Sequence, residues 1–357
     1  MAVHRFRYFF KRFEKLAGSS GILPTIRKNK LYYLLIPFFI TAEFIALWKL
    51  VRKIKPDVVH AHWLIPQGFV AAIVKKLTGT PFVVTAHGSD VFGLRGNIFR
   101  LCKIFSINNA DRITVVSSVI KKAASEMSNS IIEPIILPMG VDSTRFSITN
   151  KDDSIRRRYD AKGPLLLFVG RLSEVKGIRY LLEAMPAVIS KEPETKLLII
   201  GSGEEEDTLK ELNTSLELER NVFFVGSIPN SDLPQFYRAA DIFVGPSIQA
   251  KGGDTEGFGL TFVEAGMSGC VLIGSNVGGI PDIIQDGRTG FLIEEKDTTA
   301  IAAKILEIIN QREDWPEIRN RTRIELVNNF SLKTIAKEYS DLLSLVCEKS
   351  NTIGHPA

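Results

Sequence analysis

The sequence predicts an α/β protein with two doubly wound domains, each built on a parallel sheet. Two series of short apolar runs alternate with helical patterns, and a polar stretch separates the two series. The 357 residues are enough for two domains of ordinary size. The expected strands are 57–62, 82–87 and 112–117 in the first series, and 165–170, 196–201, 221–226, 241–246 and 271–276 in the second.

Each of these runs is rich in Val, Ile, Leu and Phe and shows no clean alternation with polar residues. That composition is typical of parallel strands whose two faces are both covered by helices. Two such series indicate two separate α/β domains. Ligands of these sheets bind beyond the carboxyl ends of the strands, so we expect the functional residues in the loops that follow the apolar runs.

The boundary between the domains is expected near 145–163, where the sequence is polar and weakly patterned. We therefore assign 1–155 to an N-terminal domain and 156–330 to a C-terminal domain. The last amphipathic stretch, 332–349, predicts a helix. It belongs to a terminal segment, 331–357, that we expect to cross back to the first domain.

The apolar stretch 31–51 is long enough to span a membrane, but Pro37, Glu43 and Lys49 interrupt it. From about Ile36 onward its apolar side chains recur at helical spacing, which predicts an amphipathic helix. The pattern favours a buried core helix. A helix that contacts a membrane surface is the second interpretation, and a helix that spans the membrane is the third. Basic clusters on both sides of the stretch are typical of a surface that faces anionic lipid.

The charge of the chain is unevenly distributed. Residues 1–160 contain 25 Lys and Arg against 11 Asp and Glu, and the remainder contains 20 against 29, so net charges of +14 and −9 combine to +5. Such asymmetry indicates a partner for the basic half, either nucleic acid, anionic lipid or an acidic substrate. No zinc-finger or RNA-binding pattern accompanies it, so we expect no nucleic-acid partner. Two interpretations of the basic half remain. It binds an anionic membrane surface, or its charge only keeps the protein soluble.

Three scattered cysteines, Cys102, Cys270 and Cys347, form no CxxC pair. A disulfide framework or a zinc knuckle is therefore not expected, and a reducing cytosol fits. The first residues, MAVHRFRYFFKRFEK, are charged throughout, unlike a signal peptide. We expect a cytoplasmic protein that contacts the inner face of a membrane peripherally.

The stretch GRLSEVKG, residues 170–177, leaves an expected strand and opens a helix. Gly170 allows a tight turn, and Arg171 and Lys176 place two cations beside the helix N-terminus. Amides, helix dipole and cations together favour a diphosphate. The alternative is a solvated loop with ordinary surface charges, and the spacing of a Walker A phosphate-binding loop is absent.

A second glycine-rich turn, GSGEEEDTLKEL at 201–212, also joins a strand to a helix. It lacks the third glycine of a dinucleotide-binding fingerprint. Its glutamates fit the start of a helix, where they complement the dipole. The glycines leave open the close approach of a base or a ribose.

The strand at 241–246 is followed by the glycine-rich loop PSIQAKGGDTEGFGLTFVEAGMSG, which becomes a helix near Gly259. Gly257 and Gly259 expose backbone N–H groups at the helix N-terminus, where phosphate and sugar oxygens bind well. Glu256 lies in the loop and Glu264 in the helix. A carboxylate accepts hydrogen bonds from two neighbouring hydroxyls, which suits a ribose or a pyranose diol. The alternative, one loop carboxylate and one buried structural carboxylate, does not explain the combination.

His60, His62 and His87 follow or end the first two expected strands. His60 and His62 are two residues apart on a strand, so their side chains face the same side. Three histidines can bind zinc, but no carboxylate or thiol completes such a site nearby in the sequence. We therefore expect core or acceptor-pocket histidines and no metal.

Taken in order, these motifs resemble the retaining family 4 (group 1) glycosyltransferases, whose GT-B fold places two Rossmann-like domains on either side of a cleft. GRLSEVKG followed by EGFGLTFVEA carries the resemblance, and Glu256 and Glu264 match the EX7E motif of the family. AHGSD at 86–90, PDVVHAHW at 56–63 and VGGIPDIIQDGRTGFLI at 277–293 match further stretches. The resemblance covers nearly the whole chain from about residue 55.

One departure from the family pattern lies at the start of the chain. Members begin with a strand and a glycine-rich loop at the cleft, whereas this sequence starts with residues that resemble material downstream of that loop. The resemblance therefore implies a first domain that is N-terminally shortened. Either the reading frame starts late, or the protein is a shortened, inactive member that binds nucleotide sugars or a partner.

The resemblance implies a role for each matched residue. Arg171 and Lys176 match the cations that hold the donor diphosphate, and Glu264 matches the glutamate that bonds the ribose hydroxyls. Glu256 matches the catalytic group that orients the transferred sugar, and His87 matches a histidine near the reacting centre. The remaining donor-binding positions, which act through backbone amides, are Gly257, Phe258, Gly259, Leu260 and Thr261.

The activity implied is transfer of a hexose from a UDP- or GDP-linked sugar to an acceptor hydroxyl with retention, in polysaccharide or lipid-linked oligosaccharide biosynthesis. In the family, cations and a helix dipole offset the charge of the leaving nucleotide, so we expect no metal and no cofactor. The expected partners are the nucleotide sugar and a sugar or lipid-linked acceptor. An epimerase or a dinucleotide oxidoreductase shares the architecture but would carry other motifs.

Overall fold

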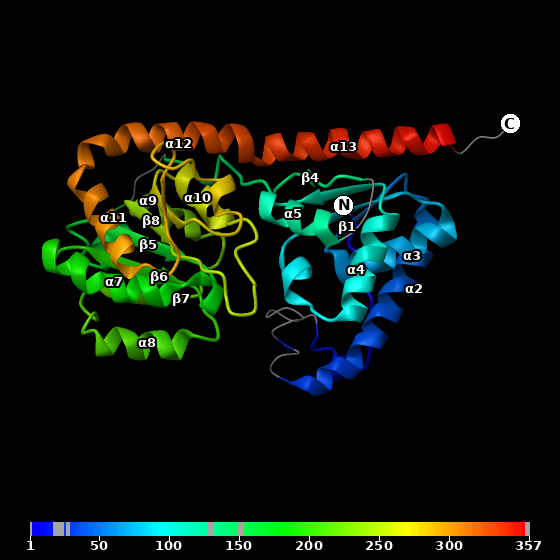
Figure 1. The fold of residues 1–357 in the computed structure, drawn as a ribbon, viewed down its shortest axis with the longest axis horizontal. Coiled ribbons are helices and arrows are strands. Elements are labelled where there is room, and N and C mark those ends of the chain that lie inside the picture. The colour runs from blue at the N-terminus through cyan, green and yellow to red at the C-terminus, as the bar shows by residue number, and fades with distance from the viewer. Residues whose placement is uncertain (1, 17–24, 26–28, 128–131, 149–152, 354–357) are drawn as a thin grey trace. The chain divides into compact units, whose positions relative to one another are not determined.

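The computed structural model describes residues 2–16, 25, 29–127, 132–148 and 153–353 (Figure 1). The chain forms two compact units. Unit 1 comprises Met1–Val116, Ile120–Ile136 and Tyr339–Ala357, and unit 2 comprises Ser117–Val119 and Leu137–Glu338.

The main boundary between the units falls before Leu137, earlier than residue 155, where the sequence pattern places it. The polar stretch that suggests the later boundary folds with unit 2. Within that stretch Arg156 forms a 3.0 Å ion pair with Asp241 of unit 2. A polar composition therefore marks the surface of unit 2 here rather than a linker.

Unit 1 contains a four-stranded parallel sheet in the order β1-β2-β3-β4. The sequence predicts the first three strands, and every residue of β2 is buried, as expected for a strand covered on both faces. It does not predict β4, because two exposed isoleucines carry no strand pattern. In the described part of the chain no strand precedes β1, which forms one edge of the sheet. The strands are β1 (Val59–His62), β2 (Phe82–Ala86), β3 (Arg112–Val115) and β4 (Ile135–Ile136).

Helices follow the strands of unit 1, as a doubly wound fold requires. α3 (Phe69–Thr78) follows β1, α4 (Asn97–Asn109) follows β2 and α5 (Ser118–Met127) follows β3. Short helical turns, η3 (Leu64–Gly68) and η4 (Ser89–Gly93), lie just beyond the carboxyl ends of β1 and β2. These turns shape the loops in which ligands of such sheets bind.

The apolar stretch near the N-terminus forms a turn, η2 (Lys30–Leu35), and the helix α2 (Ile36–Ile54). The prediction of a helix is confirmed, but the prediction of a buried core helix is wrong, because only Phe39 and Val51 of α2 are buried. The segment Lys30–Ile54 is long and apolar enough to cross a membrane, and 17% of its most apolar window is buried. Helical periodicity predicts that a helix has an apolar face, but it does not show whether other parts of the fold cover that face.

Aromatic residues of the N-terminal segment pack on the start of α2. The ring centroid of Phe9 lies 5.2 Å from that of Phe38, and Leu16 and Phe39 are buried in the same cluster. The short turn η1 (Lys11–Phe13) lies within this segment. Several large apolar side chains of the N-terminal segment, η2 and the start of α2 are exposed. We call the exposed side chains Phe10, Phe13, Leu31, Tyr33, Leu34 and Phe38 the N-terminal apolar patch.

Unit 2 contains a six-stranded parallel sheet in the order β10-β9-β8-β5-β6-β7. The first five strands along the chain are those that the sequence predicts. β10 is three residues long, too short for a pattern. The strands are β5 (Leu165–Val169), β6 (Lys196–Ile200), β7 (Val222–Gly226), β8 (Ile242–Gly245), β9 (Val271–Ser275) and β10 (Phe291–Ile293).

The helices of unit 2 cover both faces of its sheet (Figure 1). α7 packs against α11 and α8, and α10 packs against α9 and α12. The core between the sheet, α7 and α11 consists mostly of Leu, Ile, Val, Met and Ala side chains, together with Phe168 and Trp315. The helices are α6 (Ser154–Arg158), α7 (Ile178–Lys191), α8 (Glu206–Ser215), α9 (Leu233–Ala239), α10 (Leu260–Met267), α11 (Thr298–Asn310) and α12 (Trp315–Phe330).

The last helix, α13 (Leu332–Ile353), contributes to both units. Its first residues belong to unit 2, and its residues from Tyr339 onward belong to unit 1. Within unit 1 the Tyr339 ring lies 5.3 Å from the ring of His60. The end of the chain therefore completes the surroundings of a residue on β1.

Candidate functional site

The side chains predicted for the site fall in both units, at the carboxyl ends of parallel strands. In unit 2 they follow β5 and β8, which are neighbours in the sheet. In unit 1 they end β1 or follow β2, which are also neighbours. Each unit therefore carries one group of candidate residues.

The loop after β5 carries the two predicted cations. Arg171 is exposed, and its guanidinium has no partner among the residues that the structure describes. Lys176 ends the turn η5 (Glu174–Lys176) and forms a short ion pair with Glu256 from the loop after β8. The side chains of Lys176 and Glu256 are 21% and 13% exposed, so solvent screens this pair less than a surface pair. The fold thus joins two predicted residues from different loops.

Glycines fix the loop that carries Glu256. Gly177 and Gly278 have φ of +62° and +59°, and a Cβ on them would lie 2.0 Å from the Pro246 carbonyl oxygen and 2.2 Å from that of Glu256, respectively. The backbone N–H of Gly279 donates a 3.0 Å hydrogen bond to the same Glu256 oxygen. Only glycine permits such close approach of two backbones. The VGG stretch therefore holds Glu256 in place, a role that sequence analysis does not assign to it.

The glycines of the turn after β6 also pack against protein. A Cβ on Gly201 would lie 1.8 Å from the Gly170 carbonyl oxygen, and one on Gly203 would lie 2.1 Å from that of Leu172. The backbone N–H of Leu172 also donates a 3.1 Å hydrogen bond to Ser202. On the side where a Cβ would lie, another backbone therefore fills the space beside both glycines. Close approach of a base or ribose to this turn stays a prediction.

Residues 257–261 form the end of the loop and the first turn of α10. Gly259 is the N-cap, with φ of +104° and no side chain capping the helix. Because the first N–H groups of a helix lack intrahelical partners, the amides here are suited to an anion. The side chain of Phe258 is buried, and its ring lies 5.4 Å from that of Phe330. The side chain of Phe258 is therefore part of the core, so only the backbone of Phe258 is available to a ligand. Gly257, which precedes it, is half-buried.

Glu264 lies in α10, about one turn beyond the helix start. The hydroxyl of Tyr237, at the end of α9, donates a 2.8 Å hydrogen bond to Glu264 Oε2. Burial raises the pKa of Glu264, while the bond from Tyr237 and the nearby Arg145 act in the opposite direction. Sequence analysis does not identify Tyr237, since a tyrosine within an apolar helix belongs to no motif. Because Tyr237 bonds only Oε2 of Glu264, the second carboxylate oxygen of Glu264 can accept a hydrogen bond from another hydroxyl.

The three histidines of unit 1 lie together. The rings of His60 and His62 are 4.4 Å apart, so they share a face as the strand period predicts. Nδ1 of His62 lies 3.0 Å from Nε2 of His87, and Nε2 of His60 lies 2.7 Å from the Thr85 hydroxyl. The structure therefore brings His87 into contact with a neighbour from β1.

These histidines are held in their neutral form. Burial lowers the pKa of His60 and of His87 to about 4, and repulsion from neighbouring histidines adds to the effect. Burial lowers the pKa of His62 as well. A neutral imidazole has one donor and one acceptor nitrogen, which suits binding of hydroxyl groups. The part of the chain that the structure describes holds no group of three His, Cys, Asp or Glu side chains suited to a metal ion.

Asp90 orders the loop that carries His87. Its side chain is 3% exposed. Oδ1 accepts hydrogen bonds of 3.0 and 2.9 Å from the backbone N–H groups of His87 and Gly88, and Oδ2 accepts one of 2.7 Å from Leu64. Burial raises the pKa of Asp90, and these backbone donors lower it. Asp90 is the last residue of AHGSD, and sequence analysis does not single it out.

Comparison with protein families gives two matches that together span most of the chain. Residues 6–145 match Glycosyltransferase Family 4, and residues 151–325 match Glycosyl transferases group 1. The two ranges cover the candidate residues of both units. The two matched ranges are separated by residues 146–150, which belong to unit 2.

Two curated relatives and one solved structure illustrate the similarity. A GDP-mannose-dependent monoacylated alpha-(1-6)-phosphatidylinositol monomannoside mannosyltransferase of Corynebacterium glutamicum is 30% identical over 74% of this chain and 70% of its own. The N-acetyl-alpha-D-glucosaminyl L-malate synthase of Bacillus anthracis is 26% identical over 80% of this chain and 74% of its own. Anabaena HepE, crystallised with UDP, superposes with a TM-score of 0.76 at 20% identity, over 84% of this chain and 81% of its own.

Proposed function

Because this chain belongs to the group 1, family 4 glycosyltransferases with the GT-B fold, we propose that it transfers a hexose from a nucleotide sugar to an acceptor hydroxyl with retention. The observation that carries the proposal is the ion pair of Lys176 and Glu256 beside the uncapped N-terminus of α10. The loops after β5 and β8 thus bring a cation, a carboxylate and the unbonded amides of a helix N-terminus close together. A sugar diphosphate needs all three.

In this proposal the diphosphate of the donor binds to Arg171, Lys176 and the amides of 259–261. Arg171 is exposed and unpaired among the described residues, so it can turn toward a phosphate without breaking an ion pair. When the bond between the anomeric carbon and the diphosphate breaks, negative charge grows on the leaving group. Two cations and a helix N-terminus stabilise that charge more strongly as it develops.

Glu264 binds the ribose hydroxyls through the carboxylate oxygen that Tyr237 leaves free. Glu256 orients the transferred sugar by accepting hydrogen bonds from its hydroxyls. The ion pair with Lys176 and the contacts of Gly278 and Gly279 fix the position of that carboxylate. A preorganised acceptor loses little freedom on binding, which supports this role.

His87 contributes from unit 1 as a neutral hydrogen-bonding group for the sugar or the acceptor. Its low pKa and its contact with His62 support this role. Asp90 acts as a positioning residue, because it bonds the backbone of His87 and Gly88 rather than a ligand.

The nucleotide is UDP or GDP in this proposal. One relative is named for GDP-mannose, and one neighbour of the same fold was crystallised with UDP. No metal is required, since Arg171, Lys176 and the α10 dipole offset the charge of the diphosphate. The acceptor is a hydroxyl of a saccharide or lipid-linked saccharide in polysaccharide or oligosaccharide assembly.

We also propose that the protein is cytoplasmic and binds the inner face of a membrane through the N-terminal apolar patch. Phe10, Leu31 and Leu34 are 72%, 69% and 70% exposed, which is unusual for side chains of this size in a contiguous surface. Basic residues surround them in the sequence, and an anionic surface attracts each one by about 1 kcal/mol. The neighbouring basic positions are Arg5, Arg7, Lys11, Arg12, Lys15 and Lys30.

The decisive experiment is incubation of the purified chain with a panel of UDP- and GDP-linked hexoses and saccharide acceptors. Mass spectrometry identifies the product, and NMR of the new anomeric proton reports retention or inversion. We expect one nucleotide to bind and its sugar to be transferred with retention. Binding without transfer or donor hydrolysis would favour an inactive nucleotide-sugar-binding protein. Binding of neither nucleotide at millimolar concentration would contradict the proposal.

A further inference from the structure

A cavity of about 430 Å³ lies in unit 2, away from the proposed donor site. Its lining includes Ala239, Ala240 and Asp241, which directly precede β8. Glu256, in contrast, follows the carboxyl end of β8. β8 is four residues long, so the two ends of this strand are about 13 Å apart. The cavity therefore lies at the opposite edge of the sheet from the donor loops.

Positive charge dominates the lining of this cavity. Four guanidinium groups and two carboxylates contribute to it, and the remaining lining side chains are uncharged. The arginines come from three separate helices, α6, α9 and α12. The charged residues are Arg156, Arg238, Arg319, Arg323, Asp153 and Asp241.

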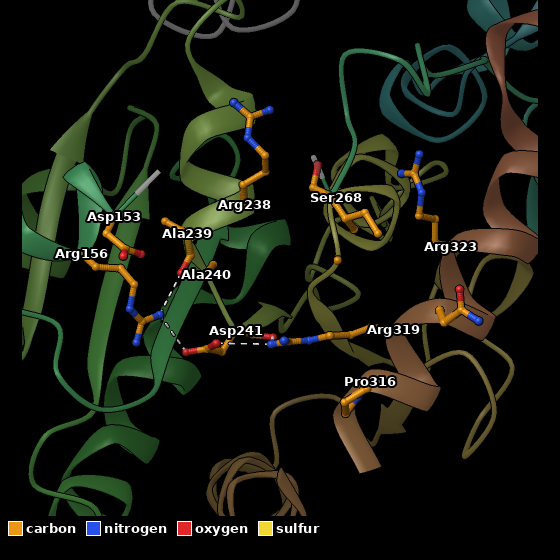
Figure 2. Close-up of a pocket in the computed structure, with 13 residues that line it drawn as sticks. Asp153, Arg156, Arg238, Ala239, Ala240, Asp241, Ser268, Pro316, Arg319 and Arg323 are labelled. Atoms are coloured by element: carbon orange, nitrogen blue, oxygen red, sulfur yellow. Dashed lines mark hydrogen bonds and ion pairs between the residues drawn. The ribbon is translucent and has the colours of Figure 1, made fainter. Parts of the chain in front are cut away.

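Asp241 forms ion pairs with only two of the arginines. Figure 2 shows Arg156 and Arg319 reaching Asp241 from opposite sides, with N–O distances of 3.0 and 3.3 Å. Arg156 also donates to the carbonyl oxygens of Ala239 and Gly163. Arg156, Asp241 and Arg319 therefore form one ion-pair network in this part of the lining.

The other two arginines have no carboxylate partner in the described ranges. Arg323 donates only to carbonyl oxygens, those of Phe146, Met267 and Ser143. Arg238 has no recorded hydrogen bond or ion pair, and in Figure 2 its guanidinium extends away from Asp241. Two positive charges are therefore left over beside the cavity.

Three buried polar atoms of the lining also lack hydrogen-bond partners among the described residues. They are the hydroxyl oxygen of Ser268 and the Nε atoms of Arg238 and Arg319. Ser268 is 4% exposed. Buried polar atoms in folded proteins are nearly always hydrogen-bonded, to protein, water or a ligand. These three atoms have almost no accessible surface themselves, but they belong to residues that line a single cavity. A rotation of their side chains would turn two N–H donors and one hydroxyl toward a ligand rich in acceptors.

A structural role for the arginines explains part of this arrangement. Arg156 bonds the carbonyl oxygen of Ala239 at the end of α9, and Arg323 bonds that of Met267 at the end of α10. Cations at helix C-termini are stabilising. This role at helix C-termini does not account for Arg238 or for the hydroxyl of Ser268.

We infer that this cavity binds a small phosphate ester, at a site distinct from the one that holds the donor. Guanidinium groups match the tetrahedral, multiply charged oxygens of a phosphate in geometry and charge. The volume lies in the range of small-molecule sites, enough for a compound of sugar-phosphate size. Arg238, Arg323 and Ser268 bind the phosphate, and the inference does not depend on which sugar the enzyme transfers.

Isothermal titration of the purified chain with glucose 6-phosphate tests the site, with inorganic phosphate and citrate as separate arms. Saturating UDP or GDP fills the donor site in a parallel titration. We expect glucose 6-phosphate to bind with and without nucleotide, inorganic phosphate to bind more weakly and citrate to bind least. Displacement by nucleotide would place the probe in the donor site and overturn the inference, and so would absence of binding by every probe.

Variants locate the site. Arg238→Gln and Arg238→Glu remove or reverse the unpaired charge and should weaken binding of glucose 6-phosphate by at least about tenfold. Arg220→Gln and Arg220→Glu are matched controls, because Arg220 is exposed and precedes β7 at the same edge of the sheet. Hydrogen exchange should slow on probe binding in peptides from α12. Equal affinities for the Arg238 and Arg220 variants would overturn the inference, as would binding with no protection of α12.

Discussion

The hydroxyl of Tyr237 donates a 2.8 Å hydrogen bond to the Glu264 carboxylate from a fully buried position. The two residues lie on different helices, α9 and α10, so the bond fixes the direction of the carboxylate independently of its own helix. Burial raises the pKa of Tyr237 well above its usual value, and the neighbouring Glu264 adds to the effect. The tyrosine is therefore protonated at neutral pH and remains a hydrogen-bond donor there.

Replacing Tyr237 by Phe should weaken nucleotide binding while leaving the ring packing in place. The loss of one hydrogen bond to a carboxylate corresponds to about 1.5–3 kcal/mol, or roughly tenfold or more in the dissociation constant of UDP or GDP measured by titration calorimetry. Tyr159→Phe is the matched control, since Tyr159 packs on Phe223 far from α10 in the sequence. Unchanged affinity in Tyr237→Phe would show that Glu264 needs no second residue to orient it.

Removing either donor-loop cation should slow sugar transfer. Arg171→Ala and Lys176→Ala each remove a charge that offsets the leaving diphosphate, so kcat/KM should fall roughly 100-fold or more. Arg179→Ala is the control, because Arg179 is exposed, lies at the start of α7 and pairs only with Glu183. Circular dichroism should show intact folding in all three. Full activity of both donor-loop variants would exclude the proposed roles.

The pH dependence of stability should change in Glu43→Gln. Burial raises the pKa of Glu43 from 4.5 to about 7, against the effect of a hydrogen bond with Gln67. A carboxyl group with a raised folded-state pKa loses its stabilising contribution as pH rises from 4.5 through 7. The uncharged variant should therefore be nearest the wild type in stability at pH 4, below the unfolded-state pKa. At pH 8 it should exceed the wild type by roughly 1–2 kcal/mol, less than the full shift because the group is not completely buried.

Urea denaturation at the two pH values measures that difference. His60 and His87 act with the opposite sign, because their lowered pKa makes the folded state lose stability as pH falls from 6.5 toward about 4. Their effect is common to the wild type and the variant and cancels in the comparison. Glu126→Gln, at an exposed position of the same unit, should show no pH-dependent gain. A constant difference for Glu43→Gln at both pH values would contradict the assignment.

Asp90→Asn should destabilise the loop around His87. An asparagine has one acceptor oxygen, so its NH2 group would face one of the three backbone donors that Asp90 now satisfies. An unsatisfied buried donor costs about 1–3 kcal/mol, which scanning calorimetry would detect as a lower Tm. Asp57→Asn, at an exposed position, is the control and should leave Tm unchanged. Equal melting of both variants would remove Asp90 from its positioning role.

The N-terminal apolar patch should mediate binding to anionic vesicles. Co-sedimentation at low salt should recover the wild type with anionic vesicles, and salt should reduce the recovery. Leu34→Asp should lower it, whereas Ile324→Asp, at a residue of α12 that is 52% exposed, should not. Equal recovery with neutral and anionic vesicles would exclude electrostatic docking. A requirement for detergent extraction would indicate a span.

Most strands of this fold are predictable from the sequence because their apolar runs reflect burial on both faces, as in β2, β5, β8 and β9. The edge strands β1 and β7 are only partly buried, yet they carry the same kind of apolar run. Eight runs of this kind become strands, from β1 at Val59–His62 to β9 at Val271–Ser275. β4 and β10 are too short to carry such a signal. For α2 the sequence predicts the helix but not its exposure, since burial depends on what tertiary structure places beside it.

The candidate site is predictable in its residue types but not in its contacts. Glycine spacing indicates a loop that approaches something closely, yet it does not distinguish a ligand from another backbone, as Gly201 and Gly203 show. The pairing of Lys176 with Glu256 joins residues 80 positions apart. Tyr237 acts through one hydrogen bond to Glu264, and Asp90 acts through three bonds from backbone N–H groups. The sequence motifs do not identify either set of bonds.

The division of α13 between the units has a consequence for how the chain is synthesised. Unit 1 needs residues from Tyr339 onward, which leave the ribosome only after all of unit 2 has been made. The part of unit 1 up to Ile136 is therefore synthesised long before the residues that complete the unit. Until Tyr339 has been synthesised, the ring of His60 lacks its packing partner from α13. Unit 2 has nearly all of its residues available earlier, so we expect it to mature first during translation although it is encoded second.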